Sequence, residues 1–388
     1  MIGIPIFSLL LLVIYTFLFL YYRIGWKKIP DHNKIPGSQP AVFISVIIPA
    51  RNEEMNLPGL LNSLLNQTYS SEFFEVIIVD DHSTDNSSNI VNNFRGLNSR
   101  CIQLSDHVTS EINSYKKKAI EIGIRESKGE LIVTTDADCS VLAPWLQNIA
   151  DFYTKNQSAF IVMPVSIYCN NNLFQVFQSL DFMALQGITG ASVQMKLHSM
   201  CNGANLAYTR KAFDDVNGFS GIDSIASGDD MLLMHKIYKH APGKVHFLKS
   251  TEVIVATEPA YTLQDFLNQR IRWASKADKY DDKSILPVLG LVYLFNLVLL
   301  VLPVIAIFKN GQMIFLGNSF SFFSLWLFLM ACKIIVELIF LYPIAVFFNK
   351  KKLLFIFPFL QPFHILYTVI AGWMGKFGTY EWKGRKVK

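Results

Sequence analysis

Long apolar runs near both ends of the chain predict helices that cross a membrane. Residues 2–22 carry no charged side chain and are long enough to span a bilayer. No basic region precedes this run and no small-residue cleavage site follows it, so we interpret residues 1–23 as a retained anchor. After residue 284, further apolar segments lie at about 285–308, 320–348 and 353–375.

Between these segments, short apolar runs alternate with helical stretches. The expected strands are VFISVIIPA, EVIIVDD, CIQLS, ELIVTTDAD and AFIVMPVSI. Helical patterns near residues 84–96, 115–127 and 143–154 separate them. This alternation predicts an α/β domain with a mainly parallel sheet over residues 42–280. Residues 29–41, which contain three prolines, are expected to link the domain to the anchor.

The composition agrees with a membrane protein. Of the 388 residues, 51% are hydrophobic, which is high for a soluble protein. Juxtamembrane positive charge indicates orientation and anionic lipid, so we expect no nucleic-acid partner. The five cysteines form no C-x-x-C motif, which predicts neither a zinc site nor disulfides and fits a reducing, cytoplasmic setting. The net charge of +5 comes largely from basic residues beside the apolar segments, namely Arg23, Lys27, Lys28, Lys350 to Lys352 and the tail.

Asp136 and Asp138 follow an apolar run and stand one residue apart. In an extended backbone their side chains point the same way and repel each other unless a cation lies between them. Mg²⁺ and Mn²⁺ prefer carboxylate and phosphate oxygens, and a site with few carboxylates is usually completed by substrate phosphates. The sequence therefore predicts a divalent-metal site here, with a solvated turn as the alternative.

Polar clusters follow three of the expected strands. They are Pro49-Ala-Arg-Asn-Glu-Glu54, Asp80-Asp81-His82-Ser83 and Asp136-Ala-Asp138. In parallel α/β sheets, ligands bind outside the carboxyl ends of the strands. We therefore expect these clusters to form one binding site, although Asp80 and Asp81 could simply begin the next helix.

Two later motifs combine polar groups with helical patterns. Gly228-Asp229-Asp230 precedes MLLMHKIYKH, so its acids are candidates for a general base or for a helix cap. The segment TLQDFLNQRIRWASK predicts an amphipathic helix, with Gln269, Arg272 and Trp273 about 140° from its apolar stripe. We expect the stripe to lie on the bilayer, with an interfacial anchor as the alternative role for the Arg-Trp pair. The stripe consists of Leu263, Phe266, Leu267, Ile271 and Ala274.

Taken in order, these motifs resemble those of family 2 inverting glycosyltransferases with a GT-A fold. The motifs are VIIPARNEE, VIIVDDHSTD, TTDAD, Gly228-Asp229-Asp230 and Gln269-Arg-Ile-Arg-Trp273. The resemblance covers roughly residues 42–280 and, in the placing of membrane segments, most of the remainder. The layout is most similar to membrane enzymes such as ceramide glucosyltransferase and the polysaccharide synthases. It implies a Rossmann-like nucleotide-sugar-binding domain with transmembrane helices at both ends.

The resemblance also implies roles on the donor side. Asp138, with Asp136, would hold Mg²⁺ or Mn²⁺. Lys116 to Lys118 could instead be a solvated helix start. Binding of a UDP-sugar donor is implied for Pro49, Arg51, Glu53, Asp80, Asp81, Lys116 and Asp136.

On the acceptor side, the resemblance selects Asp230 as the general base with Asp229 beside it, although Asp229 stands where the family usually has Glu. Arg272 would bind the diphosphate, Trp273 would form an aromatic wall for the acceptor, and Gln269 belongs to the same catalytic motif. Gly203 and Asn205 match a family segment that lies near the acceptor site; the alternative is that they form a plain turn.

We therefore expect an inverting, metal-dependent glycosyltransferase that moves a sugar from a UDP-sugar to a membrane-associated lipid acceptor. The domain would face the cytoplasm at a bacterial inner membrane, since Arg23, Lys27 and Lys28 follow the first span. The alternatives are a processive polysaccharide synthase and a non-catalytic nucleotide- or lipid-binding membrane protein on a decayed transferase fold.

The C-terminal membrane region, residues 285–375, is expected to contain two full spans and one broken or re-entrant segment. Pro358 and Pro362 interrupt the last apolar run, and the basic tail 376–388 would then stay cytoplasmic. Lys333 and Glu337, at i and i+4, are expected to neutralise each other while facing other helices, with a role in guiding a lipid headgroup as the alternative.

Overall fold

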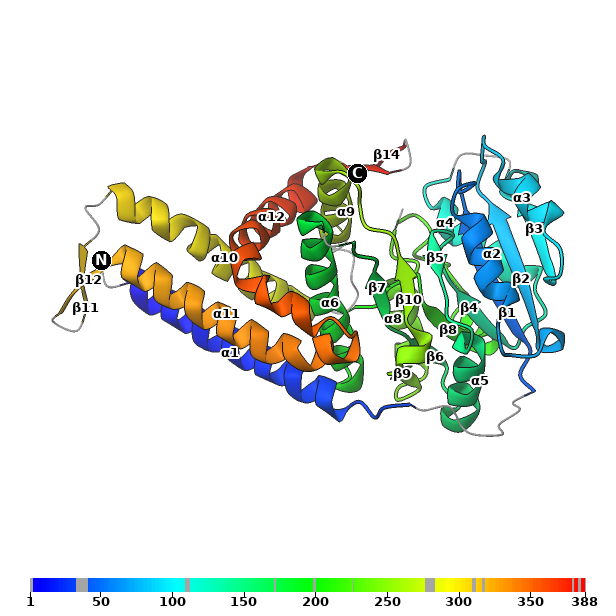
Figure 1. Ribbon diagram of the computed structural model, residues 1–388, viewed down its shortest axis with the longest axis horizontal. Coiled ribbons are helices and arrows are strands. Elements are labelled where there is room, and N and C mark those ends of the chain that lie inside the picture. The colour runs from blue at the N-terminus through cyan, green and yellow to red at the C-terminus, as the bar shows by residue number, and fades with distance from the viewer. Residues whose placement is uncertain are drawn as a thin grey trace. The chain divides into compact units, whose positions relative to one another are not determined.

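The chain divides into two compact units, which we call the helical unit and the sheet unit. The helical unit comprises Met1–Lys27, Cys169–Gly187 and Ala260–Lys388, and the sheet unit comprises Lys28–Tyr168 and Ile188–Pro259. Figure 1 shows the elements of both units in a computed structural model. The structure describes residues 3–32, 41–108, 112–170, 172–197, 200–225, 227–275, 283–308, 312–315, 318–378, 380–382 and 385–387.

The sheet unit is built on a seven-stranded sheet with the strand order β3-β2-β1-β4-β8-β6-β9. Strands β3, β2, β1 and β4 are parallel, β8 is antiparallel to β4 and β6, and β9 is parallel to β6. This arrangement confirms the α/β fold class with a mainly parallel sheet. The bounds are β1 Ile44–Ala50, β2 Phe74–Asp80, β3 Ser99–Gln103, β4 Leu131–Thr134, β6 Phe160–Val162, β8 Leu206–Thr209 and β9 Val245–Phe247.

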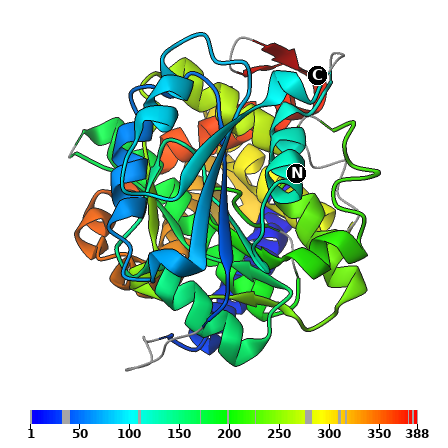
Figure 2. The same cartoon turned by 90° about the vertical axis from the view of Figure 1, so that its right-hand side faces the viewer.

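Helices cover the sheet on both sides, which explains why its central strands β1, β2 and β4 are largely apolar. Every residue of β2 is buried, as expected for a strand of a covered parallel sheet. In Figure 2, α2 (Leu57–Leu65, blue) and α4 (Tyr115–Arg125, cyan) lie on opposite sides of β1 and β2. Gly123 lets α4 approach β1 closely, because a Cβ atom there would lie 2.5 Å from Ile47 Cγ2. The remaining helices of this unit include α3 Ser87–Asn93, α5 Trp145–Asn156, α7 Arg210–Asp215 and α8 Met231–His240.

A smaller sheet with the order β5-β10-β7 also belongs to the sheet unit. Its strands are β5 Cys139–Ser140, β7 Val165–Ile167 and β10 Val255–Thr257. Strand β5 begins directly after Asp138. Its pairing with β10 therefore fixes the chain on the C-terminal side of the D-x-D motif.

Long apolar helices form most of the helical unit. Among the described residues, α1 (Gly3–Lys28), α10 (Ile285–Phe308) and α11 (Phe322–Phe347) are long and apolar enough to cross a membrane. Aromatic side chains join them, since Tyr15 of α1 packs on Phe295 of α10. The unit also contains α9 Leu263–Ala274, α12 Phe357–Phe377 and the first part of α6 Leu173–Gln194.

Helix α12 runs continuously through the segment where the sequence suggests a break. Pro358 stands in its first turn, where the missing N–H has no helical partner to lose, and Pro362 lies inside the helix. A hairpin of β13 (Tyr380–Trp382) and β14 (Arg385–Val387) follows, with β13 beside α9. The re-entrant or interfacial position of this segment stays a prediction.

The expected pairing of Lys333 with Glu337 is confirmed. Lys333 Nζ lies 2.7 Å from Glu337 Oε1 and donates to Gln361 Oε1 of α12 at 2.6 Å. Gln361 Nε2 donates to Glu337 Oε2 at 2.8 Å, and the Tyr15 hydroxyl of α1 donates to Oε1. The two charges therefore face other helices and are satisfied within the unit.

Candidate functional site

The polar clusters after β2, β1 and β4 lie at one edge of the sheet. These strands are neighbours in the sheet, with Ala50 of β1 opposite Asp80 of β2 and Ile47 opposite Thr134 of β4. Because the strands are parallel, their carboxyl ends point the same way. The sheet topology thus brings together the three clusters that the sequence predicts to share a site.

Lys116 connects the D-x-D motif to the G-D-D motif. Its Nζ lies 2.6 Å from Asp136 Oδ1 and 3.4 Å from Asp229 Oδ2. Burial opposes the charged form, but the carboxylates of Asp136 and Asp229 prevail and raise the pKa of Lys116 above its ordinary value. Lys116 is therefore a cation between two acids, and a solvated helix start is excluded for this residue.

Asp230 is held at the first turn of α8. Its Oδ1 accepts a hydrogen bond from the Met231 N–H at 2.7 Å, and its Oδ2 accepts one from the Gly203 N–H at 3.2 Å. A Cβ atom on Gly203 would lie 3.0 Å from Asp229 Oδ2 and 3.3 Å from Lys116 Nζ. Gly203 thus lets the backbone approach both acids, and the Asp230 carboxylate is oriented from two sides.

The D-x-D residues fit a divalent cation only in partnership with other oxygen ligands. Asp136 and Asp138 are both partly exposed, and Asp136 Oδ1 is already engaged by Lys116. Across the ranges described above, no cluster of three or more His, Cys, Asp or Glu side chains forms a metal site by itself. Two carboxylates completed by phosphate oxygens are, however, a common donor set for Mg²⁺. The residues present fit a metal that arrives with a nucleotide.

The two acids after β2 have different surroundings. Asp80 is 3% exposed, and its carboxylate accepts hydrogen bonds from the Ser83 N–H at 3.0 Å and from the Ser88 hydroxyl. These contacts organise the loop after β2, and the expected contact of Asp80 with a nucleoside stays a prediction. Asp81 is also buried, and its Oδ1 lies 3.8 Å from Nη1 of Arg51.

The cluster after β1 contributes local contacts as well. Glu53 Oε2 accepts from Asn56 Nδ2 at 2.7 Å, and the Glu53 N–H donates to Ser87 Oγ at 2.8 Å. Pro49 lies within β1, opposite Val79 of β2. These contacts fix the loop between β1 and α2 and keep its polar groups at the same edge of the sheet.

Asn205 requires a correction. It is fully buried, its Oδ1 accepts from Trp145 Nε1 at 3.1 Å, and its Nδ2 donates to the carbonyl oxygens of Pro164 and Val253, each at 2.8 Å. A buried amide whose groups are satisfied in this way stabilises the fold. The expected contact with an acceptor is therefore wrong for Asn205, whereas Gly203 does lie beside the acids.

In the helical unit, the buried arginine of α9 is Arg270, which the sequence reasoning missed. Its guanidinium lies 2.7 Å from Asp181 Oδ2 of α6 and donates to Gln269 Oε1 at 2.6 Å. The same group stacks over the rings of Phe266 and Trp273, at 4.5 and 4.3 Å from their centroids. Arg270 thus orients both Gln269 and Trp273. Its place in the apolar stripe, four residues after Phe266, was the signal available in the sequence.

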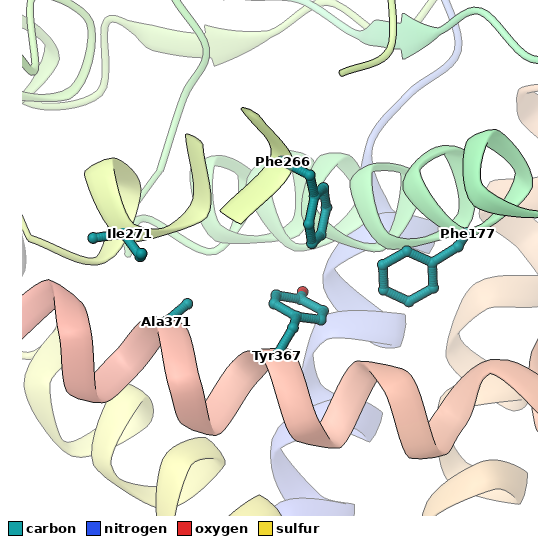
Figure 3. Close-up of a cluster of buried hydrophobic side chains, with 5 residues drawn as sticks. All are labelled: Phe177, Phe266, Ile271, Tyr367 and Ala371. Carbon is teal, nitrogen blue, oxygen red and sulfur yellow. The ribbon is translucent and has the colours of Figure 1, made fainter. Parts of the chain in front are cut away.

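The apolar stripe of α9 packs against protein. Figure 3 shows Phe266 and Ile271 of α9 facing Tyr367 and Ala371 of α12, with Phe177 of α6 beside them. All five side chains are buried. The expectation that this stripe lies on the bilayer is therefore wrong at these positions, because α6 and α12 cover it.

Gln269, Arg272 and Trp273 belong to the helical unit, whereas the acids and Lys116 belong to the sheet unit. Trp273 packs on Phe182 of α6 within its own unit, with 6.0 Å between the ring centroids. That these two groups serve one active site stays a prediction.

Comparisons with known proteins find relatives among glycosyltransferases. The chain is 26% identical over 224 residues to a probable glycosyltransferase of Sulfolobus acidocaldarius, covering 55% of this chain and 47% of the relative. It is 36% identical over 100 residues to an undecaprenyl-phosphate 4-deoxy-4-formamido-L-arabinose transferase of Shewanella sediminis, covering 25% and 28%. The chain thus spans about half, or less, of the length of these curated relatives.

A solved structure shares the fold. The mannosyltransferase PcManGT from Pyrobaculum calidifontis, in complex with GDP-Man and Mn²⁺, is similar with a TM-score of 0.58 at 17% identity, covering 95% of this chain and 99% of that chain. Two family models also match: Glycosyl transferase family 2 over residues 45–216, and Glycosyl transferase family group 2 over residues 131–350, which is more than half of the chain. The chain therefore belongs to the family 2 group of glycosyltransferases.

Proposed function

We propose that this protein is an inverting glycosyltransferase that moves a sugar from a UDP-sugar to a membrane-associated lipid acceptor. The observation that carries the proposal is the pair of short contacts from Lys116 to Asp136 and Asp229. These contacts join an acidic motif suited to a nucleotide diphosphate with a second acidic motif suited to an acceptor hydroxyl. Family membership supports the same reaction.

On the donor side, the leaving nucleotide diphosphate carries negative charge that must be offset. Lys116 supplies one positive charge at the carboxyl end of β4. Asp138 and Asp136 would hold Mg²⁺ or Mn²⁺, which supplies further charge neutralisation when bound with the phosphates. Arg272 is proposed to add a planar pair of donors to the diphosphate.

On the acceptor side, we assign the general base to Asp230. Its carboxylate takes the proton of the acceptor hydroxyl as that oxygen forms a bond to the sugar C1. The bond from C1 to the diphosphate oxygen breaks on the opposite face, and the nucleotide leaves with the electron pair. One displacement of this kind inverts the anomeric carbon. The Gly203 N–H and the Met231 N–H hold the carboxylate in a fixed orientation.

A lipid acceptor is supported by the three helices that are long and apolar enough to cross a membrane. The Shewanella relative is named for an undecaprenyl-phosphate substrate, which is a lipid carrier. We place the sheet unit on the cytoplasmic face of a bacterial inner membrane, where nucleotide sugars are available. The basic residues Arg23, Lys27 and Lys28 at the C-terminal end of α1 support this orientation.

The decisive experiment uses the full chain in nanodiscs of bacterial polar lipids with Mn²⁺. Release of UDP or GDP is measured from a panel of UDP-sugars and GDP-mannose, with Asp230→Asn as the control. We expect release from one UDP-sugar, labelled product in the lipid phase and an inverted anomeric configuration by NMR.

Other outcomes would replace the proposal. Release from GDP-mannose alone would change the donor, and labelled polymer would indicate a polysaccharide synthase. Nucleotide binding without release from any donor would indicate a non-catalytic protein.

A further inference from the structure

Lys117 of α4 is buried under the loop that leads to the G-D-D motif. Its exposed fraction is 2%, and its Nζ donates to the carbonyl oxygens of Ile222 at 2.6 Å, Ile225 at 2.7 Å and Ser227 at 3.0 Å. An ammonium group has three N–H donors, and here each reaches a backbone carbonyl. A buried lysine is tolerated when it is satisfied in this way.

The three consecutive lysines of α4 have separate roles. Lys116 contacts Asp136 and Asp229, Lys117 contacts the loop carbonyls, and Lys118 forms a partly exposed pair with Glu121 at 3.3 Å. The first turn of α4 therefore holds the D-x-D motif with one lysine and the approach to the G-D-D motif with the next.

A second lysine holds the beginning of the same loop. Lys236 of α8 donates to the carbonyl oxygens of Gly218 at 2.6 Å and Ser220 at 2.8 Å. The carbonyls that Lys236 contacts are farther in sequence from Asp229 and Asp230 than those that Lys117 contacts. The carbonyl of Ser227, by contrast, is separated from Asp229 only by Gly228, which adopts a positive φ of 84°.

We propose that Lys117 is a positioning residue that sets the place of Asp229 and Asp230 relative to the D-x-D motif. It acts through the loop and touches neither donor nor acceptor. The inference rests on the proposed transfer reaction. Because a displacement of the base by about 1 Å can cost on the order of 100-fold in rate, the loop carbonyls are an effective point of control.

The test compares Lys117→Met with Lys118→Met, which makes the same substitution one residue later on the same helix. We expect Lys117→Met to lower kcat about 10- to 100-fold while the donor KM stays within about twofold. Lys118→Met should leave kcat and the donor KM within about twofold of the wild type, because Lys118 forms only a partly exposed ion pair with Glu121. Lys236→Met should lower kcat more than Lys118→Met does and less than Lys117→Met does.

Hydrogen–deuterium exchange gives a readout that does not depend on activity. In Lys117→Met, the peptide covering Ile222 to Asp229 should exchange at least about tenfold faster, while β1 and β4 should exchange as in the wild type. Equal kcat in Lys117→Met and wild type would overturn the proposal. Equal acceleration of exchange in the loop and in β1 would also overturn it, since this indicates general destabilisation.

The two levels of inference fail differently. If the wild type releases no nucleotide from any donor, the proposed function fails, and the exchange experiment still decides whether Lys117 holds the loop. If Lys117→Met does not fold, Lys117→Gln keeps an amide donor at the site. For Lys117→Gln we then expect a smaller loss of kcat with the same local increase in exchange. If kcat and the loop exchange of this variant both equal those of the wild type, Lys117 is not a positioning residue.

Discussion

Arg270 of α9 donates from Nε and Nη2 to a single carboxylate oxygen of Asp181 on α6, at 3.1 and 2.7 Å. The two side chains are each 4% exposed, and the second Asp181 oxygen accepts from the Tyr367 hydroxyl. The orientation of Gln269 and Trp273 therefore depends on an ion pair inside the helical unit.

Arg270→Met should destabilise the protein strongly. Removing one partner of a buried ion pair leaves an uncompensated charge and costs about 3–5 kcal/mol. We expect a clear fall in the thermal unfolding midpoint in detergent, measured by tryptophan fluorescence. Arg125→Met is the control, because the Arg125 side chain is 59% exposed in its pair with Glu126. Similar midpoints for the two variants would contradict the structural role of Arg270.

Metal removal should stop transfer reversibly. EDTA should abolish sugar transfer, and Mn²⁺ or Mg²⁺ should restore it, because in the proposed mechanism the two D-x-D carboxylates would hold the metal together with phosphate oxygens. Asp138→Asn should lose transfer and bind Mn²⁺ more weakly in the presence of UDP, as measured by EPR. Full sugar transfer in EDTA would show that Lys116 and other basic side chains neutralise the diphosphate without a metal ion.

Asp230→Asn should reduce turnover with little change in UDP affinity. General-base catalysis contributes about 10²–10⁴-fold, so a loss of that order is expected for a variant that keeps the Gly203 contact. Turnover is measured by UDP release and affinity by calorimetry. Asp229→Asn is the comparison, and a far greater loss of turnover there would assign the base to Asp229.

The sheet unit should lose stability as the solution becomes acidic. Burial, reinforced by Lys244, lowers the pKa of His246, and Ser158 Oγ lies 2.8 Å from its Nδ1. Below about pH 6.5 the unfolded chain binds a proton that the folded protein excludes, so stability falls as the pH drops from 6.5 toward the lower folded pKa.

The measurement is the unfolding midpoint between pH 5 and pH 8. His246→Gln should flatten its dependence on pH, whereas His240→Gln, at a side chain 53% exposed, should not. Parallel curves for all three proteins would rule out His246 as a source of the effect.

Much of the site could be predicted from sequence because its signals are local. Apolar runs ending in polar clusters identify strand ends, and the parallel order then brings Asp80, Asp136 and the β1 cluster to one edge. Lys117 was also accessible in principle. It precedes Ile120 and Ile124 by three and seven residues, so it lies on the buried face of α4.

The role of Asn205 could not be predicted. An Asn two residues after a glycine has the same local pattern whether it binds a ligand or satisfies buried groups. Which of the two applies depends on partners far along the chain, such as Trp145 and Val253 for Asn205. Those partners are defined only by the tertiary structure.

The hydrogen bond from Tyr15 to Glu337 joins residues 322 positions apart. During synthesis, α1 is made before the whole sheet unit, and Glu337, which accepts from the buried Tyr15 of α1, follows only with α11. Gln361 of α12 then completes the group around Lys333. The polar group of the helical unit can therefore be completed only late in synthesis, and a truncated chain that ends before α11 would leave the Tyr15 hydroxyl of α1 without Glu337.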